Sequence, residues 1–377
     1  MIARSFNGED LGHYYIIFGI ILISNGFISA TAIYFFQQNF DFFSDNERYG
    51  QIIGSISFMA LVSSGLVGII AWIYSPGSQI AFFLLAFVYI LLDSLRKIAN
   101  SLNLYKLIVF SDFLVAITSL SLVFYSQKTI NDVAFSYFIA MTMASIVYFL
   151  GIRKYVNVKL EFDVKYIKSG FISGRSNVLT VIYMILTSQF LVWVSKIVDS
   201  TTGAGVLQAM INLFGFMNPV MTGIGNFTYS QIPKSEKSKL VQLIFNIRSI
   251  YIIAITCLII IVAIITLNRG IFVGFYFDNV NYANYANLIP IVGLTSVALV
   301  LSQIEGVILS SLGYPNLVAR YQLISTIACI ILLPPLCILF GIYGIAIARL
   351  FAEIVKGVLV FRKNSFISKE AYEKIHS

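Results

Sequence analysis

Polar residues recur along one face of the apolar segment 204–227, and they are the first candidates for chemistry in this sequence. They are Gln208, Asn212, Gly215, Pro219, Thr222 and Asn226, spaced at i, i+4, i+7, i+11, i+14 and i+18. This spacing predicts one side of a helix with the usual 3.6 residues per turn. A water-filled cavity on that side explains the pattern, and Gln208, Asn212 and Asn226 would then bind substrate. A helix–helix interface, which also favours small and polar residues, is the alternative.

A cationic residue near the inner end of segment 171–195 is the second candidate. Gln189 follows Arg175 by 14 residues, so both fall within about 40° of one helical face. A guanidinium could hold a diphosphate through paired N–H donors, and we predict that Arg175 and Gln189 bind substrate. The alternative is that Arg175 extends to the lipid headgroups at the inner surface.

Charged residues inside apolar segments are costly and therefore functional candidates. Asp112 and Glu305 are predicted to bind a coupling proton or cation. Alternatively, one of them pairs with Arg175, or each stays neutral because burial disfavours the charged form. Arg349, Glu353 and Lys356 are spaced at i, i+4 and i+7, which predicts an internally neutralised ladder with a structural Arg349–Glu353 ion pair.

Other site chemistries find little support. Cys257, Cys329 and Cys337 lie inside apolar segments without a CxxC spacing, and His13 and His376 are at opposite ends of the chain. We therefore predict no metal site and no disulfide. No cofactor is expected, and no ATP-binding motif is present. The net charge of +8 does not form a basic patch, so nucleic acid is not an expected partner.

Composition indicates that these residues are carried by membrane-spanning helices. The 377 residues are 58% hydrophobic and 11% charged, whereas soluble domains have about 45–50% apolar and about 25% charged residues. A spanning helix needs about 20 mostly apolar residues. Eleven segments qualify: 13–36, 51–74, 79–96, 104–126, 133–152, 171–195, 204–227, 248–267, 287–312, 318–340 and 343–362. The first is predicted to be a retained span, not a removed signal peptide.

The basic residues between the spans predict the orientation. Counted with their flanks, the loops after the first, third, fifth, seventh and ninth spans and the carboxyl-terminal tail hold 19 Lys and Arg residues. The remaining loops and the amino-terminal segment hold 4. Cytoplasmic loops carry the excess of positive charge, so the amino terminus is predicted outside and the carboxyl terminus in the cytoplasm. Arg96 and Lys97 are predicted to be anchors at the inner surface.

An internal repeat predicts two halves. Segment 101–105 joins two spans in the first half, 311–315 does so in the second, and both begin with Ser-Leu. Matching spans around these hairpins leaves segment 171–195 without a partner. We therefore predict an all-α polytopic protein with a five-helix bundle over 1–152, a basic cytoplasmic linker over 153–170 and a six-helix bundle over 171–377. Parallel repeats of this kind are typical of transporters.

Three stretches carry a resemblance to a known family. Residues 3–14 contain an AR…G-E-x-x-G-x-Y pattern, 275–290 are an aromatic outer loop, and 341–348 read G-x-x-G-x-A-x-A with Glu353 following. Together they resemble the polysaccharide flippases of the MOP superfamily, the O-antigen (Wzx-like) branch. That family usually has twelve or more helices, with one before the first motif, so the resemblance implies a twelve-helix plan that lacks its first helix.

The resemblance also implies a function. It implies flipping of an undecaprenyl-diphosphate-linked oligosaccharide across a bacterial plasma membrane by alternating access, with membrane lipids, a glycan polymerase and assembly proteins as partners. A cation-coupled multidrug exporter of the same superfamily is one alternative. A membrane-embedded glycan polymerase or acyltransferase is another. An enzyme of that kind should have polar outer loops with catalytic residues, and the outer loops here are short, so we expect no enzyme.

Overall fold

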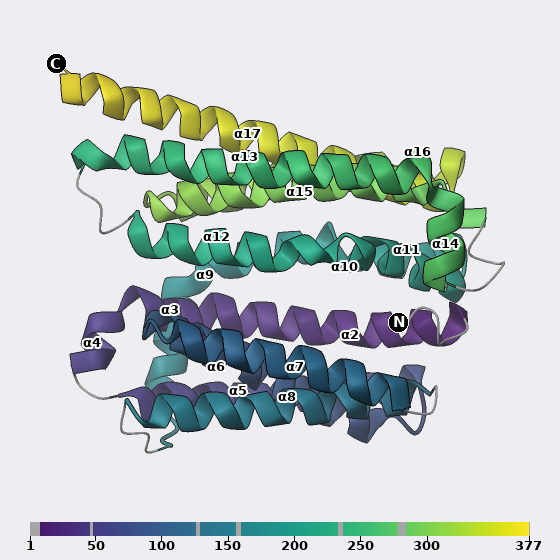
Figure 1. Ribbon diagram of the computed structural model, residues 1–377, viewed down its shortest axis with the longest axis horizontal. Helices are drawn as coiled ribbons and strands as arrows, with labels where there is room; N and C mark the ends of the chain where they lie inside the picture. The colour runs from purple at the N-terminus through teal and green to yellow at the C-terminus, as the bar shows by residue number, and fades with distance from the viewer. Residues whose placement is uncertain are drawn as a thin grey trace. The chain divides into compact units, whose positions relative to one another are not determined.

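The structure, a computed structural model, describes residues 8–45, 48–125, 129–155, 160–232, 237–277 and 284–376. All regular elements in these ranges are helices (Figure 1). Nine described helical stretches are long and apolar enough to cross a membrane, and they coincide with nine of the predicted spans. The other two predicted spans, 204–227 and 343–362, are also helical in the structure. The predicted all-α, multi-pass membrane fold is therefore confirmed.

Contacts within the chain divide it into two compact units, Met1–Val181 and Ile182–Ser377, called unit 1 and unit 2 below. In unit 1, the long helices lie side by side (Figure 1). Its elements are α2 (Gly8–Ile28), η1 (Ser29–Ile33), α3 (Tyr34–Gln38), α4 (Phe40–Asp45), α5 (Tyr49–Tyr74), α6 (Gln79–Ser101), α7 (Tyr105–Tyr125), α8 (Ile130–Arg153) and the first part of α9 (Val164–Leu186).

Unit 2 begins within α9 and contains the remaining helices. They are α10 (Gln189–Val198), α11 (Thr201–Leu213), η2 (Gly215–Met217), α12 (Asn218–Gln231), α13 (Lys237–Leu267), α14 (Arg269–Phe277), α15 (Leu288–Ser311), α16 (Pro315–Phe340) and α17 (Ile342–His376). Helix α17 packs along both α15 and α16. It therefore presents its buried face to two neighbours at once, which matters for the charged residues on it.

The predicted linker over 153–170 differs from what the structure describes. Only residues 160–163 of its described part are extended, and α9 already begins at Val164. The extended segment is bound to α5, because Ser55 Oγ accepts a hydrogen bond from the Asp163 amide at 3.1 Å. Tyr166, at the start of α9, donates to the Ala32 carbonyl at 2.5 Å. The division between the units accordingly falls at Val181, inside α9, and not at the predicted linker.

The two inner hairpins of the predicted repeat have the same backbone conformation. The amides of Leu102, Asn103 and Leu104 bond to the carbonyls of Ile98, Asn100 and Ala99, and those of Leu312, Gly313 and Tyr314 bond to Ile308, Ser310 and Leu309. Asn103 and Gly313 both have positive φ, 58° and 91°. This is the usual way to end a helix with a left-handed residue. The Ser-Leu repeat in the sequence therefore marks a repeated three-dimensional turn.

Two of the predicted continuous helices are interrupted. Segment 204–227 breaks into α11 and α12 at the short 3-10 turn η2, and segment 171–195 breaks between α9 and α10 at Thr187 and Ser188. The first span also contains a π-helical turn, η1. The prediction of one uninterrupted polar face over 204–227 is therefore wrong, because the turn at Gly215 changes the angular relation between residues before and after it.

Candidate functional site: a cavity in unit 2

A cavity of about 70 Å³ lies inside unit 2. Helices α10, α11, α12, α15 and α17 contribute to its wall, together with η2. Most of the side chains on this wall are apolar. The polar side chains are Ser188, Asn212, Asn218, Thr295, Ser296 and Arg349. An apolar pocket with a few polar groups is the usual form of a small-molecule site.

The break between α11 and α12 lies on the wall of this cavity. Helix α11 ends at Leu213, and α12 begins at Asn218 with Pro219 in its first turn. Proline is tolerated there because the first amides of a helix have no partner within it. Gly215 and Asn218 both line the cavity. The amides of Phe214 and Met217 bond to the carbonyls of Ile211 and Phe214, so the backbone of the break is itself hydrogen-bonded.

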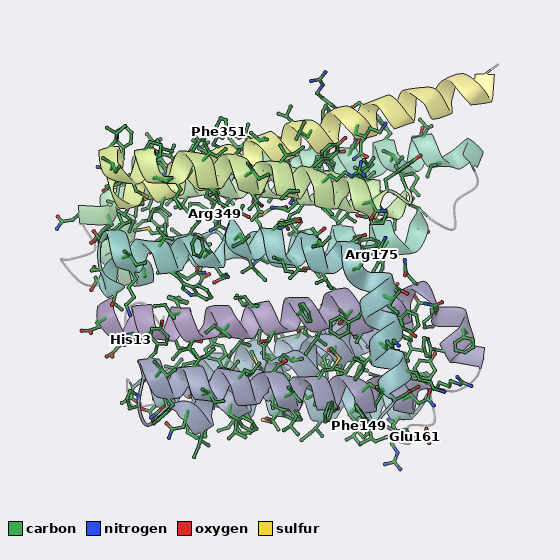
Figure 2. All side chains as sticks on the ribbon, turned by 180° about the vertical axis from the view of Figure 1, so that it is seen from behind. His13, Phe149, Glu161, Arg175, Arg349 and Phe351 are labelled. Atoms are coloured by element: carbon green, nitrogen blue, oxygen red, sulfur yellow. The ribbon has the colours of Figure 1, made fainter. Side chains whose placement is uncertain are left out.

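Arg349 of α17 is the one charged side chain on the described wall of the cavity. Figure 2 shows it between the layer of α15 and α17 and the layer of α10 to α12. Its Nε atom is buried and has no hydrogen-bond partner among the described residues. An unpartnered buried guanidinium is costly, and its donors match the geometry of a carboxylate or a phosphate. Arg349 is therefore well placed to bind an anionic group in the cavity.

The predicted ion pair between Arg349 and Glu353 is not at contact distance. No ion pair within 4.0 Å joins them in the part of the chain that the structure describes. Glu353 instead accepts a hydrogen bond from Ser302 of α15 at 2.7 Å. The two side chains still interact electrostatically along one face of α17. Glu353 thus partly neutralises the charge of Arg349 without forming an ion pair with its guanidinium.

Two of the predicted substrate-binding residues belong to this site. Asn212 lines the cavity, and Gln208, one turn earlier on α11, donates from Nε2 to its Oδ1 at 3.0 Å. Gln208 is buried. Asn226 lies in α12, but its side chain is outside the described residues. The structure therefore places Asn212 on the cavity wall and Gln208 in contact with it, and their substrate contacts stay a prediction.

The other two predicted substrate-binding residues are not brought into the cavity wall. Gln189 is the first residue of α10 and follows Ser188, which does line the cavity. Arg175 lies in the part of α9 that belongs to unit 1 and is exposed. Their predicted shared face assumed one continuous helix. The break at Thr187 and Ser188 removes that basis.

Glu305, predicted to bind a coupling ion, has resident partners in the C-terminal half of α15. Arg248 of α13 binds its carboxylate with two hydrogen bonds of 3.0 Å. Asn364 of α17 donates to it at 2.6 Å, and the hydroxyl of Tyr251 donates to it as well. The Glu305 side chain is fully buried. Its positive partner is Arg248 and not Arg175, the partner considered from the sequence, and the coupling role stays a prediction.

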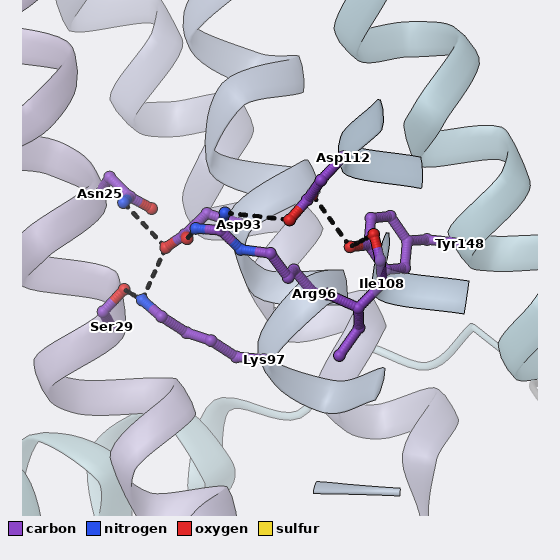
Figure 3. A network of polar contacts seen from close by, with 8 residues as sticks. All are labelled: Asn25, Ser29, Asp93, Arg96, Lys97, Ile108, Asp112 and Tyr148. Atoms are coloured by element: carbon purple, nitrogen blue, oxygen red, sulfur yellow. Dashed lines mark hydrogen bonds and ion pairs between the residues drawn. The ribbon is translucent and has the colours of Figure 1, made fainter. Parts of the chain in front are cut away.

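Asp112, the second predicted coupling residue, belongs to a polar network in unit 1 (Figure 3). Tyr148 of α8 donates to it at 3.2 Å, and Arg96 of α6 lies at 3.8 Å. The centre of this network is Asp93, which sequence reasoning missed. Asp93 forms ion pairs of 2.6 Å with both Arg96 and Lys97. An acidic residue three and four positions before two basic ones was the available signal.

Asn25 and Ser29 connect the same network to α2 and η1. Asn25 donates to Asp93 at 2.9 Å, and Lys97 donates to Ser29 at 2.7 Å (Figure 3). Arg96 and Lys97 are therefore held by protein groups in addition to any contact with headgroups. The network joins α2, η1, α6, α7 and α8, and this arrangement stabilises the bundle of unit 1.

A smaller polar cluster in unit 2 joins the residues before α15 to the residue after α10 and to the start of α17. The Tyr285 hydroxyl donates to the Asp199 carboxylate at 2.9 Å. Burial, and then this hydrogen bond, raise the pKa of Tyr285 to about 12. Tyr343 donates to the Asn284 carbonyl at 2.9 Å. The hydroxyl of Tyr285 therefore remains a donor at neutral pH and holds the loop before α15 against the start of α11.

Comparisons with known proteins identify the fold. No family model and no curated protein matches the chain. Solved structures do. One is an inward-facing multidrug resistance MATE family transporter of the MOP superfamily, with 13% identity, a TM-score of 0.74 and coverage of 99% of this chain and 93% of that one. Another is the eukaryotic MATE transporter AtDTX14, with 15% identity, a TM-score of 0.62 and coverage of 99% and 89%.

A Vibrio cholerae MATE transporter, VcmN, is similar to the same degree. A variant of it has 14% identity, a TM-score of 0.62 and coverage of 99% of this chain and 90% of that one. These likenesses extend over nearly the full length of both partners. The chain therefore has the multi-helix fold of MATE transporters.

Proposed function

We propose that this chain is a transporter that moves an anionic, lipid-linked oligosaccharide across the membrane by alternating access. The fold of transporters supports the first part. The single observation that supports the substrate class is the Arg349 guanidinium, which is the one charged group on the described cavity wall. An anion gains from this charge, and a cation is repelled by it.

The chemistry of such a substrate fits the cavity. Its diphosphate would accept paired hydrogen bonds from Arg349, and its sugar hydroxyls would bond to Asn212 and Asn218 of the same wall. A glycan head cannot cross hydrocarbon unaided because unpaired polar groups are costly to bury. The protein would enclose the head, and the lipid tail would stay in the bilayer. The substrate contacts predicted from the sequence for Arg175, Gln189 and Asn226 are not part of this proposal.

Export of drugs is the second candidate, because the transporter with a TM-score of 0.74 is described as a multidrug resistance protein. Cationic drugs and an anionic lipid make opposite demands on Arg349. The cavity wall offers a cation no described carboxylate. Transport of a cationic drug would therefore have to improve, not fail, when the charge at Arg349 is removed.

Removal of the charge tests the proposal. We expect Arg349→Met to slow the flipping of a fluorescent undecaprenyl-diphosphate oligosaccharide in proteoliposomes by about 10- to 100-fold, the value of a hydrogen bond to a charged group. Arg349→Lys should retain part of the rate. Arg320, exposed on α16, gives the matched control Arg320→Met, which should flip at the wild-type rate. Equal rates for Arg349→Met and wild type would contradict the proposed site.

A further inference from the structure

Lys356 is a buried basic residue without a described partner. It lies on α17 two turns after Arg349 and is 4% exposed. No hydrogen bond or ion pair of its amine is present within the described ranges. A buried ammonium ion without an ion-pair partner is costly in a membrane protein. A lysine can meet this cost by releasing its proton, which an arginine cannot do.

Gln322 of α16 lies level with Lys356, and its Nε2 atom donates a hydrogen bond to Thr187 Oγ1 at 3.4 Å. The register follows from the hydrogen bond of 2.7 Å between Ser325 Oγ on α16 and the Ala352 carbonyl on α17. These helices are antiparallel, so one further turn along each brings Gln322 and Lys356 to the same level. Gln322 is fully buried, and its Oε1 has no partner among the described residues. An acceptor that lacks a donor therefore stands level with an amine that lacks an acceptor.

Glu353 lies between Lys356 and Arg349 on the same face of α17. It is 3% exposed and interacts electrostatically with both basic residues. One carboxylate can compensate one of the two positive charges. When the amine of Lys356 is neutral, Glu353 compensates Arg349. When the amine is protonated, Arg349, Glu353 and Lys356 together carry one positive charge in excess.

The remaining titratable groups on the helices around α17 are already occupied or distant. On α15, Glu305 is bound by Arg248 and Tyr251 of α13. On α16, the described buried titratable group is Cys329, which lies near Arg349 and Glu353. On α10, Lys196 is in the last turn at the other end of the unit. Glu353 is therefore the charged neighbour that senses the proton on Lys356.

We propose that Lys356 binds the proton that controls anion binding in the cavity of unit 2. This inference rests on the proposed anion site at Arg349. A hydronium ion transfers its proton to the lone pair of the amine, so that an N–H bond forms and an O–H bond of the hydronium ion breaks. Glu353 then compensates Lys356, and the charge of Arg349 becomes available to an anion. Because linkage is reciprocal, anion binding must take up a proton, and release of the anion must return it.

Binding measured against pH tests this linkage. The purified full chain in lipid nanodiscs would be titrated with undecaprenyl diphosphate at several pH values, and proton uptake would be followed with an indicator dye in weak buffer. We expect wild-type affinity to fall by about tenfold per pH unit through the range in which Lys356 releases its proton. Lys356→Arg should bind the probe tightly and Lys356→Met weakly. In both variants, the affinity should change with pH only as far as the ionisation of the probe itself requires.

Two results would contradict the inference, and they differ from failure of the proposed function. Lys356→Met that keeps the wild-type slope would show that another group takes the proton. Wild type that binds the probe without proton uptake would show that no proton is linked to anion binding. If wild type binds no probe at any pH, the anion site itself is wrong. Lys106, exposed on α7, gives the control Lys106→Met, which should keep the wild-type slope. Lys356→Arg keeps the test valid if the Met variant fails to fold.

Discussion

Buried charges in this protein fall into two groups that differ in how they are partnered. Glu305 is surrounded by donors from α13 and α17. Arg349 and Lys356 have no such partners among the described residues. A fully satisfied buried ion holds a structure together, whereas an unsatisfied one keeps its binding capacity for something else. We therefore expect the partners of Glu305 to contribute to stability, and we propose a binding role for Arg349 and Lys356.

The Arg248–Glu305 pair gives a stability prediction. Arg248→Met leaves the fully buried Glu305 without its cation, and we expect a loss of about 3–5 kcal/mol in the free energy of unfolding. Chemical unfolding of the solubilised protein, followed by tryptophan fluorescence, would measure it.

The double variant Arg248→Met/Glu305→Met is the informative control for this pair. It removes both charges, so most of the lost stability should return. Arg269, exposed at the start of α14, gives the control Arg269→Met, with an expected change close to zero. A double variant no more stable than Arg248→Met would show that the lost stability does not come from the unpaired charge of Glu305.

At this scale the sequence predicts the need for a partner better than the partner itself. Glu305 inside an apolar segment must be neutralised, but Arg248 is 57 residues away in the chain, and no spacing rule connects them. Asp93 was missed because its basic neighbours were interpreted as headgroup anchors. Arg349 was predicted to pair with Glu353 from i, i+4 spacing. That spacing fixes a shared face, and rotamers and the competing donor Ser302 decide the contact.

Among the helices of unit 1, α9 and η1 make one of the closest described contacts. A Cβ atom at Gly174 would lie 2.3 Å from the Ala30 carbonyl oxygen, and one at Gly170 would lie 3.3 Å from that of Thr31. Such distances require that no side chain be present at Gly174. Because Gly174 has no side chain, the backbone of α9 can pack directly against η1 of the first span.

Alanine at this position gives a prediction for the element. Gly174→Ala forces α9 and η1 apart, and we expect a loss of about 1–3 kcal/mol in stability. Gly65, in the interior of α5, gives the matched control because a Cβ atom added there would meet nothing within 4 Å. Gly65→Ala should gain up to about 1 kcal/mol because glycine is a poor helix former. Melting temperatures of the two variants in one detergent would be compared, and equal shifts would contradict the contact.

The spans were predictable and their interruptions were not. Apolar length identifies each crossing because the bilayer sets it. The turn η1, the turn η2 and the break before α10 interrupt segments whose sequence predicts continuous helices, and their hydropathy does not mark where the interruptions fall. Gly215 and Pro219 are a partial signal for the second of these. Gly341 and Ile342 separate two predicted spans, and in the structure Gly341 alone lies between α16 and α17. Its φ of 55° confirms that a turn occurs there.

For the whole molecule, the repeat and the fold agree. The hairpins at Asn103 and Gly313 have the same hydrogen bonds, which supports a duplicated architecture of transporter type. The extent of each unit was harder to predict. The basic composition of 153–170 indicated a linker in water, but the contacts of α9 continue unit 1 to Val181. The basic residues of a segment predict that it lies in water, but they do not predict which helices it contacts.

The central claim is that this chain moves lipid-linked glycan between leaflets. The most direct test is the leaflet distribution of lipid-linked oligosaccharide in cells deleted for the gene, with and without the 377-residue chain restored. We predict accumulation on the inner leaflet after deletion, clearance on restoration, and no clearance with Arg349→Met at equal expression. An unchanged leaflet distribution after deletion would contradict the claim and would make drug export the leading function.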